Sequence, residues 1–286
     1  MAEQSGLPYP LVSVIMNCLN CEKYLKEAID SVYAQTYHNW EIIFWDNAST
    51  DRSAEIARSY DSRLRYFRGE QTVNLGEARN LALEQARGEF IAFLDCDDLW
   101  MPQKLEKQIP LFDDPEVGLV FSNSIIFNDL GESRLFYGRN PNFHTGYCFP
   151  QLLTDYFLDL ETVVLRRAAL DGEEMWFDPN FNLIEEGDLF TRIGYRWKLA
   201  MVNEPLAKWR VHAAGWTWTK GYLTADEKTA MLERYKKTFP GFSERYAKEI
   251  EIVETQIAVK RAKHLWREGN SPAARKCLAP HLVKGR

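Results

Sequence analysis

The sequence is short of the features that mark secreted, membrane-spanning or disordered chains. Cysteine is scarce, with five among 286 residues, and an odd, scattered set does not make a disulfide framework, which favours a reducing compartment. No apolar run is long enough to span a bilayer, and residues 1–10 lack the basic-then-apolar pattern of a secretion signal. Hydrophobic residues make up 45% and charged residues 27% of the chain, which excludes disorder. We therefore expect a folded, soluble, cytoplasmic protein.

An excess of positive charge is also missing. The net charge is −6, which argues against a nucleic-acid partner. The charge is unevenly spread, because residues 260–286 hold eight basic residues and a single acidic one, Glu268. A solvated helical face is the commoner interpretation of such a basic tail. The hypothesis that we carry forward is peripheral contact of residues 260–286 with anionic lipid at the inner face of the membrane.

Short apolar segments alternate with amphipathic ones through the first two-thirds of the chain. Strands are expected over residues 11–16, 40–45, 64–67, 90–94 and 117–121, and helices over residues 24–32, 53–60 and 75–87. We expect Gly88 to close the third of these helices in a left-handed conformation. The alternation predicts an α/β fold with a mostly parallel sheet flanked by helices.

From about residue 221 the patterns are helical only. Thr224 and Glu227 match a capping box at the start of one helix, Ser243 begins a longer helix, and Ser271 caps a short last one. We therefore divide the chain into an α/β domain at residues 9–220 and a C-terminal helical extension at residues 221–286.

Polar clusters follow three of the predicted strands, at residues 17–20, 46–51 and 95–98. Ligands of open parallel sheets bind beyond the carboxyl ends of the strands, so we expect these clusters to meet at one edge. The segment Asp95-Cys-Asp-Asp98 places three carboxylates in four positions. Unpaired carboxylates are costly to bury, and hard oxygen ligands suit Mg²⁺ or Mn²⁺. The alternative is that Asp97 and Asp98 only cap the helix that follows.

Four segments in this order resemble the motifs of glycosyltransferase family 2, in particular its bacterial members with the GT-A fold. They are the opening Val12-Ser-Val-Ile-Met-Asn-Cys-Leu-Asn20, the turn Asp46-Asn-Ala-Ser-Thr-Asp51, the segment Asn74-Leu-Gly-Glu-Ala-Arg-Asn80, and Gly88-Glu-Phe-Ile-Ala-Phe-Leu-Asp-Cys-Asp-Asp98. The resemblance covers roughly residues 11–216, and it implies a GT-A-like sheet that binds a nucleotide-sugar donor.

The resemblance also implies roles for single residues. Asn20 lies in the nucleotide-binding loop, Asp46 contacts the base or ribose, and Arg79 contacts the base or phosphate. Asp95 contacts the ribose and the donor sugar, and Asp97 holds a Mn²⁺ or Mg²⁺ ion on the diphosphate. Without the resemblance, Asp46 is equally well explained by an Asx turn, and Arg79 by a solvated helix face.

The segment Ile184-Glu-Glu-Gly-Asp-Leu-Phe-Thr-Arg192 resembles the part of the family that carries the catalytic base. On that register Glu186 replaces the family's aspartate as the base of an inverting transfer, and Asp188 is the second candidate. The alternative interpretation is that these acids only stabilise the first turn of a helix, where the helix dipole favours negative charge. His212, in a strand ending in Arg-x-His, is expected to join the metal or the diphosphate, and Trp216 and Trp218 to form a lid, a sugar platform or simple core packing.

The sequence thus predicts an inverting, metal-dependent glycosyltransferase. It would move a hexosyl or N-acetylhexosaminyl group from a nucleotide-diphosphate donor, by default a UDP-sugar, to a hydroxyl of a saccharide or lipid-linked acceptor. Two alternatives share the acidic motif: a non-catalytic sugar-binding or scaffold protein, which the substitution at Glu186 favours, and a phosphohydrolase of the haloacid-dehalogenase type. A third, a thioredoxin-like oxidoreductase, rests on the pair Cys18 and Cys21.

Overall fold

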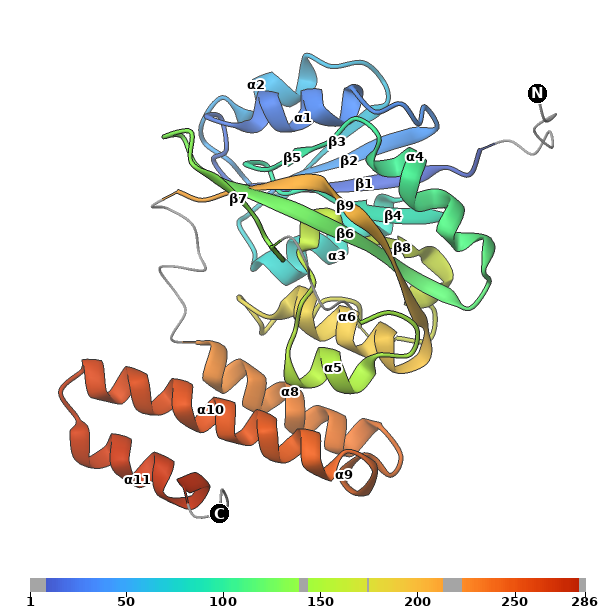
Figure 1. Cartoon of the computed structure of the whole chain (residues 1–286). Coiled ribbons are helices and arrows are strands. Elements are labelled where there is room, and N and C mark those ends of the chain that lie inside the picture. Colours follow the sequence, from blue (N-terminus) through green and yellow to red (C-terminus); the bar gives the residue numbers. More distant parts are fainter. Residues whose placement is uncertain (1–8, 139–143, 174, 213–222, 283–286) are drawn as a thin grey trace.

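The computed structural model describes residues 9–138, 144–173, 175–212 and 223–282 (Figure 1). Its strands are β1 (Val12–Cys18), β2 (Trp40–Asp46), β3 (Leu64–Arg68), β4 (Phe90–Phe93), β5 (Leu99–Trp100), β6 (Val117–Phe127), β7 (Ser133–Leu135), β8 (Val164–Arg166) and β9 (Lys198–Arg210). Its α-helices are α1 (Leu25–Tyr33), α2 (Ser53–Arg58), α3 (Leu75–Gln85), α4 (Lys104–Gln108), α5 (Phe149–Thr154), α6 (Glu185–Arg196), α8 (Thr224–Thr238), α9 (Phe242–Arg245), α10 (Ala247–Arg267) and α11 (Ser271–Leu282).

The strands form one sheet in the order β3-β2-β1-β4-β8-β6-β9-β5, with β7 paired to β6. The first four strands in this order are parallel, as the alternation of strands and helices predicts. Beyond β4 the sheet is mixed, because β8 runs antiparallel to both β4 and β6. The predicted α/β class and all five predicted strands are confirmed, whereas β5, β7 and β8 lie in segments where the sequence shows no clear period.

Helices cover both faces of the sheet, and the strands supply apolar side chains to each. Successive side chains of a strand point to opposite faces: Val14 and Met16 pack with α1 and α4, and Ile15 packs with α3 and α6. Figure 1 shows α1 and α2 above the sheet and α3 and α6 below it. The polar turns that follow β1, β2 and β4 therefore lie between two apolar layers and point to the same edge.

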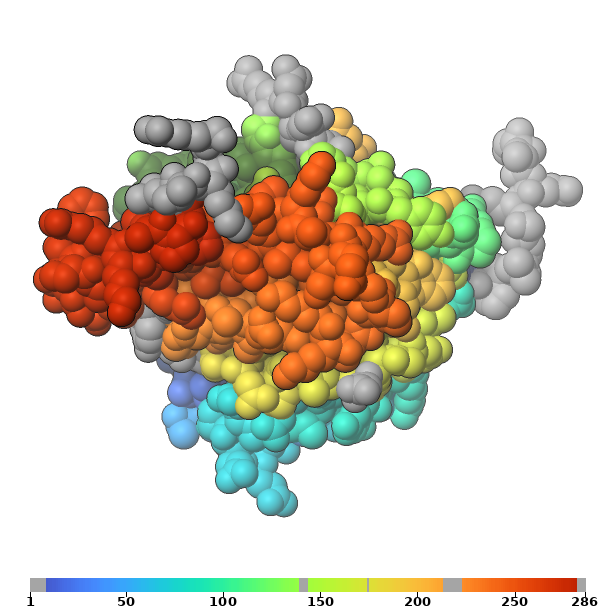
Figure 2. All heavy atoms as spheres, turned by 90° about the horizontal axis from the view of Figure 1, so that it is seen from below, coloured from blue at the N-terminus to red at the C-terminus, as the bar shows by residue number. Residues whose placement is uncertain are grey.

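The C-terminal helices pack beneath α5 and α6. A separate apolar cluster joins Phe149 of α5 to Leu232 and Tyr235 of α8 and to Val253 of α10. Seen from below, the orange helices lie in front of the yellow segment that contains α6, and the red C-terminal helix lies to one side (Figure 2). The boundary that we predict at residues 220 and 221 lies outside the described residues. Within the described part of the chain, no helix combines the length and apolarity needed to cross a bilayer.

The helix ends of this region differ from the predicted ones. Glu227 accepts the backbone N–H groups of Asn182 and Leu183, 2.9 and 3.1 Å away, so its carboxylate ties α8 to the loop before α6. The helix expected from Ser243 is broken between α9 and α10. Asn270, not Ser271, caps α11, because its Oδ1 accepts the backbone N–H of Ala273.

Glycine is needed at position 88 because a side chain would not fit there, and not because of a left-handed turn. Its φ is not in the positive region, so the predicted helix cap is wrong. A Cβ at this position would lie 2.5 Å from the backbone nitrogen of Ser13 and 2.7 Å from the carbonyl oxygen of Leu11. The chain needs glycine here because the loop before β4 passes directly against the backbone of β1.

We predict that Gly88→Ala lowers the free energy of unfolding by about 2–3 kcal/mol, as expected for overpacking against backbone. The measurement is urea unfolding followed by circular dichroism. Gly187→Ala is the matched control, because its Cβ would meet Tyr156 at 3.6 Å, an ordinary contact, and alanine is the better helix former. Equal stability of the two variants would contradict the close approach.

Candidate active site

The polar ends of β1, β2 and β4 meet through hydrogen bonds, as predicted. The backbone N–H of Asn20 donates to Ser49 Oγ at 3.0 Å, and the N–H of Thr50 donates to Asn20 Oδ1 at 2.8 Å. The thiol of Cys96 donates to the carbonyl of Asn17. Asn20 adopts a φ of 58°, a conformation that asparagine tolerates better than most residues. The loop that we expect to bind the nucleotide is therefore fixed to its two neighbours.

Asp46 is fully buried at the end of β2. Its Oδ1 accepts the backbone N–H of Ser49 at 2.7 Å, which is the Asx turn weighed as an alternative. Its Oδ2 accepts the hydroxyl of Tyr66 and pairs with the guanidinium of Arg68. Arg68 is half-exposed and lines a cavity of about 510 Å³ beside Trp45 and Gln71. In this structure Asp46 orients Arg68 toward that cavity, and its own oxygens are both engaged.

Asp97 and His212 come together although 115 positions separate them. His212 Nε2 lies 2.7 Å from Asp97 Oδ2, and the exposed fractions of the two side chains are 24% and 37%. Asp95, on the other side of Cys96, is 38% exposed. A carboxylate oxygen and an imidazole nitrogen at one rim are donors that Mn²⁺ accepts. The residues present therefore fit a divalent cation.

The third carboxylate of the motif has a different task. Asp98 is buried, and its Oδ1 accepts the backbone N–H of Arg210 at 2.6 Å. The side chain of Arg210 donates from Nε to the carbonyl oxygen of Asp97, 2.8 Å away. Asp98 thus ties the turn after β4 to β9, and does not cap a helix. Arg210 is the arginine of the Arg-x-His pattern, so this pattern could have marked it as a residue of the site.

Glu161 is a buried acid that the sequence analysis missed. One of its carboxylate oxygens lies within 4.8 Å of oxygens of Asp95 and Asp98. Burial raises the pKa of Glu161 and of Asp98 well above the usual carboxyl range. Burial also lowers the pKa of Lys104, which lies under the same turn with its Nζ 4.3 Å from the ring centre of Trp100. No local motif marks Glu161, because it follows an irregular segment.

Arg79 links the two halves of the site. It is only 3% exposed, so the solvated helix face is excluded. From α3 its guanidinium donates to Glu185 Oε1 at 2.6 Å and to Asp95 Oδ1 at 3.2 Å. Glu186 Oε2 lies 3.7 Å from the same guanidinium. Gly76, one turn earlier, permits this position, because a Cβ there would lie 2.8 Å from the carbonyl oxygen of Asp178. The predicted donor contact of Arg79 stays a prediction.

Glu186 lies at the first turn of α6 with 24% of its side chain exposed. Burial, followed by the negative charge of Glu185, raises the pKa of Glu186 to about 8. The positive charge of Arg79 opposes this rise. A general base works best when its pKa is near the working pH. Glu186 therefore has the exposure and the proton affinity that a base requires.

Asp188, the second candidate for the base, is fully buried. Its carboxylate pairs with Arg192 and Arg234, and it accepts the hydroxyl of Tyr235 at 3.0 Å. Three donors occupy its oxygens and join α6 to α8. This arrangement favours Glu186 over Asp188 as the candidate base, and the role of each residue stays a prediction. Trp216 and Trp218, which we expect near the donor, lie outside the described residues.

Comparison with known sequences places this geometry in a family. The family model described as glycosyl transferase family 2 matches residues 13–170, more than half of the chain. The chain belongs to glycosyl transferase family 2. It is 39% identical over 120 residues to the UDP-Glc:alpha-D-GlcNAc-diphosphoundecaprenol beta-1,3-glucosyltransferase WfgD of Escherichia coli, a match that covers 42% of this chain and 47% of WfgD. It is 28% identical over 264 residues to an uncharacterised glycosyltransferase of Rickettsia typhi, covering 89% and 77%.

This family 2 glycosyltransferase has the GT-A fold, as solved structures show. It superposes with a TM-score of 0.62 on Staphylococcus aureus TarS residues 1–349 in complex with UDP-GlcNAc, at 16% identity, covering 95% of this chain and 91% of that one. It superposes with a TM-score of 0.66 on the mannosyltransferase PcManGT of Pyrobaculum calidifontis, at 18% identity, covering 97% and 76%. These findings favour none of the alternative functions. The chain spans about half the length of the first curated relatives it matches.

We predict that Asp188→Asn lowers the free energy of unfolding by about 3 kcal/mol, because Arg192 and Arg234 each lose one of their two carboxylate partners at a fully buried position. Turnover per folded molecule stays within a few-fold of the unmodified chain. Asp226→Asn is the matched control on α8, because Asp226 pairs with Arg261 at an exposed site. This substitution should lower the free energy of unfolding by less than about 1 kcal/mol. A thousand-fold loss of turnover in a stably folded Asp188→Asn protein would restore Asp188 as the base.

Proposed function

We propose that this family 2 enzyme transfers a sugar from a UDP-linked donor to a hydroxyl group of a lipid-linked saccharide, with inversion at the anomeric carbon. The observation that carries the proposal is the position of Glu186, a single half-buried carboxyl group with a raised pKa, joined through Arg79 to the rim that holds Asp97 and His212. The printed name of WfgD, with its UDP-sugar donor and diphosphoundecaprenol acceptor, supports the choice of substrates.

In the proposed reaction the acceptor hydroxyl attacks the anomeric carbon from the face opposite the diphosphate. Glu186 takes the hydroxyl proton as the new C–O bond forms and the bond to the diphosphate breaks. One base and a single displacement invert the configuration. Glu185 stays paired with Arg79 at 2.6 Å, and this contact holds the first turn of α6 in place while Glu186 changes its charge.

The donor side of the site is proposed to involve residues from three strand ends. Asp97 and His212 would hold Mn²⁺ or Mg²⁺, which when bound neutralises the charge of the leaving diphosphate. Asp95 contacts the ribose and sugar, and Asn20 shapes the loop around the nucleotide. Asp46 acts through Arg68, which it orients toward the neighbouring cavity.

We also propose that the basic tail at residues 260–286 contacts anionic lipid. Arg275 and Lys276 are exposed on α11, where a membrane surface can reach them. Such a contact would hold the enzyme at the inner face of the membrane, close to a lipid-linked acceptor.

We predict that Glu186→Gln lowers turnover at least about 100-fold, because the proton acceptor is lost. The dissociation constant of UDP changes less than about twofold. Loss of UDP binding would remove Glu186 from the role of base.

The same variant has a second readout in the pH dependence of stability. The pKa of Glu186 is higher in the folded protein than in the unfolded chain. The folded protein therefore loses stability as the pH rises from the pKa of the unfolded glutamate through about 8. The Glu186→Gln protein lacks this loss, so at pH 9 it should unfold at higher urea, with a gain on the order of 3 kcal/mol. The transfer rate of the unmodified enzyme should rise with pH through about 8. A rate that falls over this range contradicts the assignment.

We predict that Asp97→Ala abolishes transfer, by about 1,000-fold or more, because the diphosphate loses its cation. The variant also loses the Mn²⁺-dependent increase in melting temperature that UDP gives the unmodified chain. Asp113→Ala, which removes an exposed carboxylate elsewhere, is the control and should keep both properties. Full activity of Asp97→Ala would overturn the metal assignment. So would donor hydrolysis by the unmodified chain at the same rate with and without Mn²⁺.

A further inference from the structure

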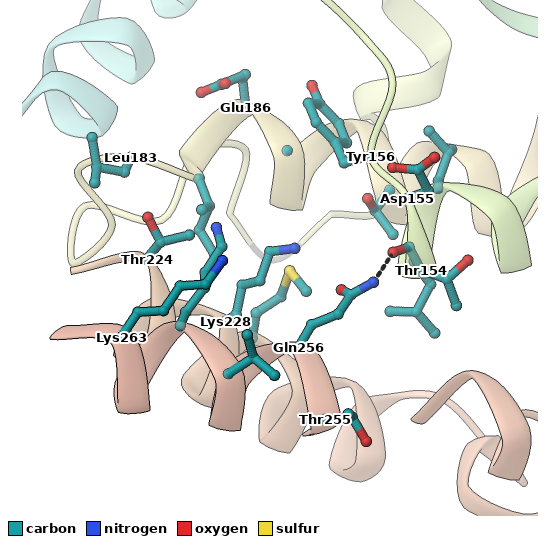
Figure 3. A pocket seen from close by; sticks show the side chains of 18 residues that line it. Thr154, Asp155, Tyr156, Leu183, Glu186, Thr224, Lys228, Thr255, Gln256 and Lys263 are labelled. Atoms are coloured by element: carbon teal, nitrogen blue, oxygen red, sulfur yellow. Dashed lines mark hydrogen bonds between the residues drawn. The ribbon is translucent and has the colours of Figure 1, made fainter. Parts of the chain in front are cut away.

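A second cavity, of about 560 Å³, lies between the catalytic domain and the C-terminal helices. One wall comes from α5, the loop after it and α6, and the other comes from α8 and α10 (Figure 3). Gln256 of α10 donates to the carbonyl oxygen of Thr154 at 2.7 Å and closes one end. The volume falls in the usual range for small-molecule sites, about 300–1,000 Å³.

The cavity combines an apolar wall with positive charge. Leu153, Ile184, Met231 and Val259 are among the apolar residues that line it. Three lysines also line it, namely Lys228 of α8 and Lys260 and Lys263 of α10. In Figure 3 the side chain of Lys228 reaches into the space beneath α6. A cavity with this lining suits a ligand that has an anionic group and an apolar part.

Among the described residues, none of the three lysines forms a salt bridge, although the negative charge of Asp155 acts to raise the pKa of Lys228. On the same two helices, Lys236 pairs with Glu233 and Glu254, and Arg261 pairs with Asp226. Burial and the charge of Lys260 lower the pKa of Lys228, and burial and the charge of Lys263 lower the pKa of Lys260. Lys228 and Lys260 come from different helices and repel each other, and Lys263 adds to the repulsion at Lys260. Asp155 offsets part of this charge, and an anion from outside the chain would relieve the rest.

Two acids also line the cavity. Asp155 is exposed at one side. Glu186 lies at the opposite rim near Tyr156, with its carboxyl group turned away from the lysines (Figure 3). Glu186 thus belongs both to the rim of this cavity and to the group of carboxylates around Arg79. The lysine-lined cavity therefore adjoins the proposed base.

We propose that this cavity is the acceptor site, in which Lys228, Lys260 and Lys263 bind the phosphate groups of the acceptor and the apolar wall takes the chain attached to them. The inference rests on the proposed function and names where its acceptor binds. Two residues of the basic tail thus have a specific ligand, in addition to any contact with a membrane surface.

The test measures binding of dodecyl diphosphate, below its micelle concentration, by titration calorimetry. The double variant Lys228→Gln and Lys263→Gln should bind at least tenfold more weakly, whereas Lys228→Arg with Lys263→Arg should bind like the unmodified chain. The charge-matched control is Lys237→Gln with Lys248→Gln, which changes exposed lysines on the same two helices. Equal weakening in the control, or undiminished binding in the first variant, would overturn the proposal.

Further ligands separate a lipid from a soluble phosphate. Inorganic pyrophosphate should bind at least tenfold more weakly than dodecyl diphosphate, and equal binding would overturn the apolar part of the proposal. Dodecyl maltoside, which has no charge, should not compete, and competition would overturn the role of the lysines. Binding of UDP with Mn²⁺ is measured in parallel. Its absence from the unmodified chain would refute the proposed function, and its retention in the lysine variants shows that the donor side is intact.

Discussion

The guanidinium of Arg79 is shared by carboxylates from two distant parts of the chain. Asp95 comes from the end of β4, whereas Glu185 and Glu186 come from the start of α6. One positive charge does not balance three negative ones in a partly buried place, so one carboxyl group must bind a proton or another cation must be present. Burial is the main cause of the raised pKa of Glu186; the charge of Glu185 adds to the rise and that of Arg79 opposes it. The cluster that positions the proposed base thus also tunes its proton affinity.

Exposure separates the acids that hold the structure from those that a ligand could reach. Asp98 and Asp188 are buried, and each is bonded to groups of distant elements, Arg210 in one case and Arg192, Arg234 and Tyr235 in the other. The half-exposed acids Asp95, Asp97 and Glu186 lie at one rim. Buried carboxylates are stable only when they are fully bonded or protonated, so their oxygens are not available to a substrate. The acids at the rim keep free lone pairs.

The C-terminal helices hold the candidate site in place through packing and hydrogen bonds. Through Asp188, Arg234 and Tyr235, α8 fixes the helix that carries Glu186, and Glu227 fixes the loop just before that helix. The same helices complete the lysine-lined cavity. The division at residue 221 separates two patterns in the sequence, but the packing makes α6, α8 and α10 one structural unit.

The five strands, the polar turns after them and the family motifs around Asp46, Arg79 and Asp97 could be predicted from the amino-acid sequence, because strand period and turn chemistry are local properties. The sequence left two acids of α6 open as the base, and Glu161 and the cavity lysines gave no local signal. The packing of the chain brings these side chains together and favours Glu186 over Asp188. Whether a carboxylate is free or bonded, and which cations share a cavity, depends on side chains that only folding brings together, such as Arg234 beside Asp188 and Lys228 beside Lys260.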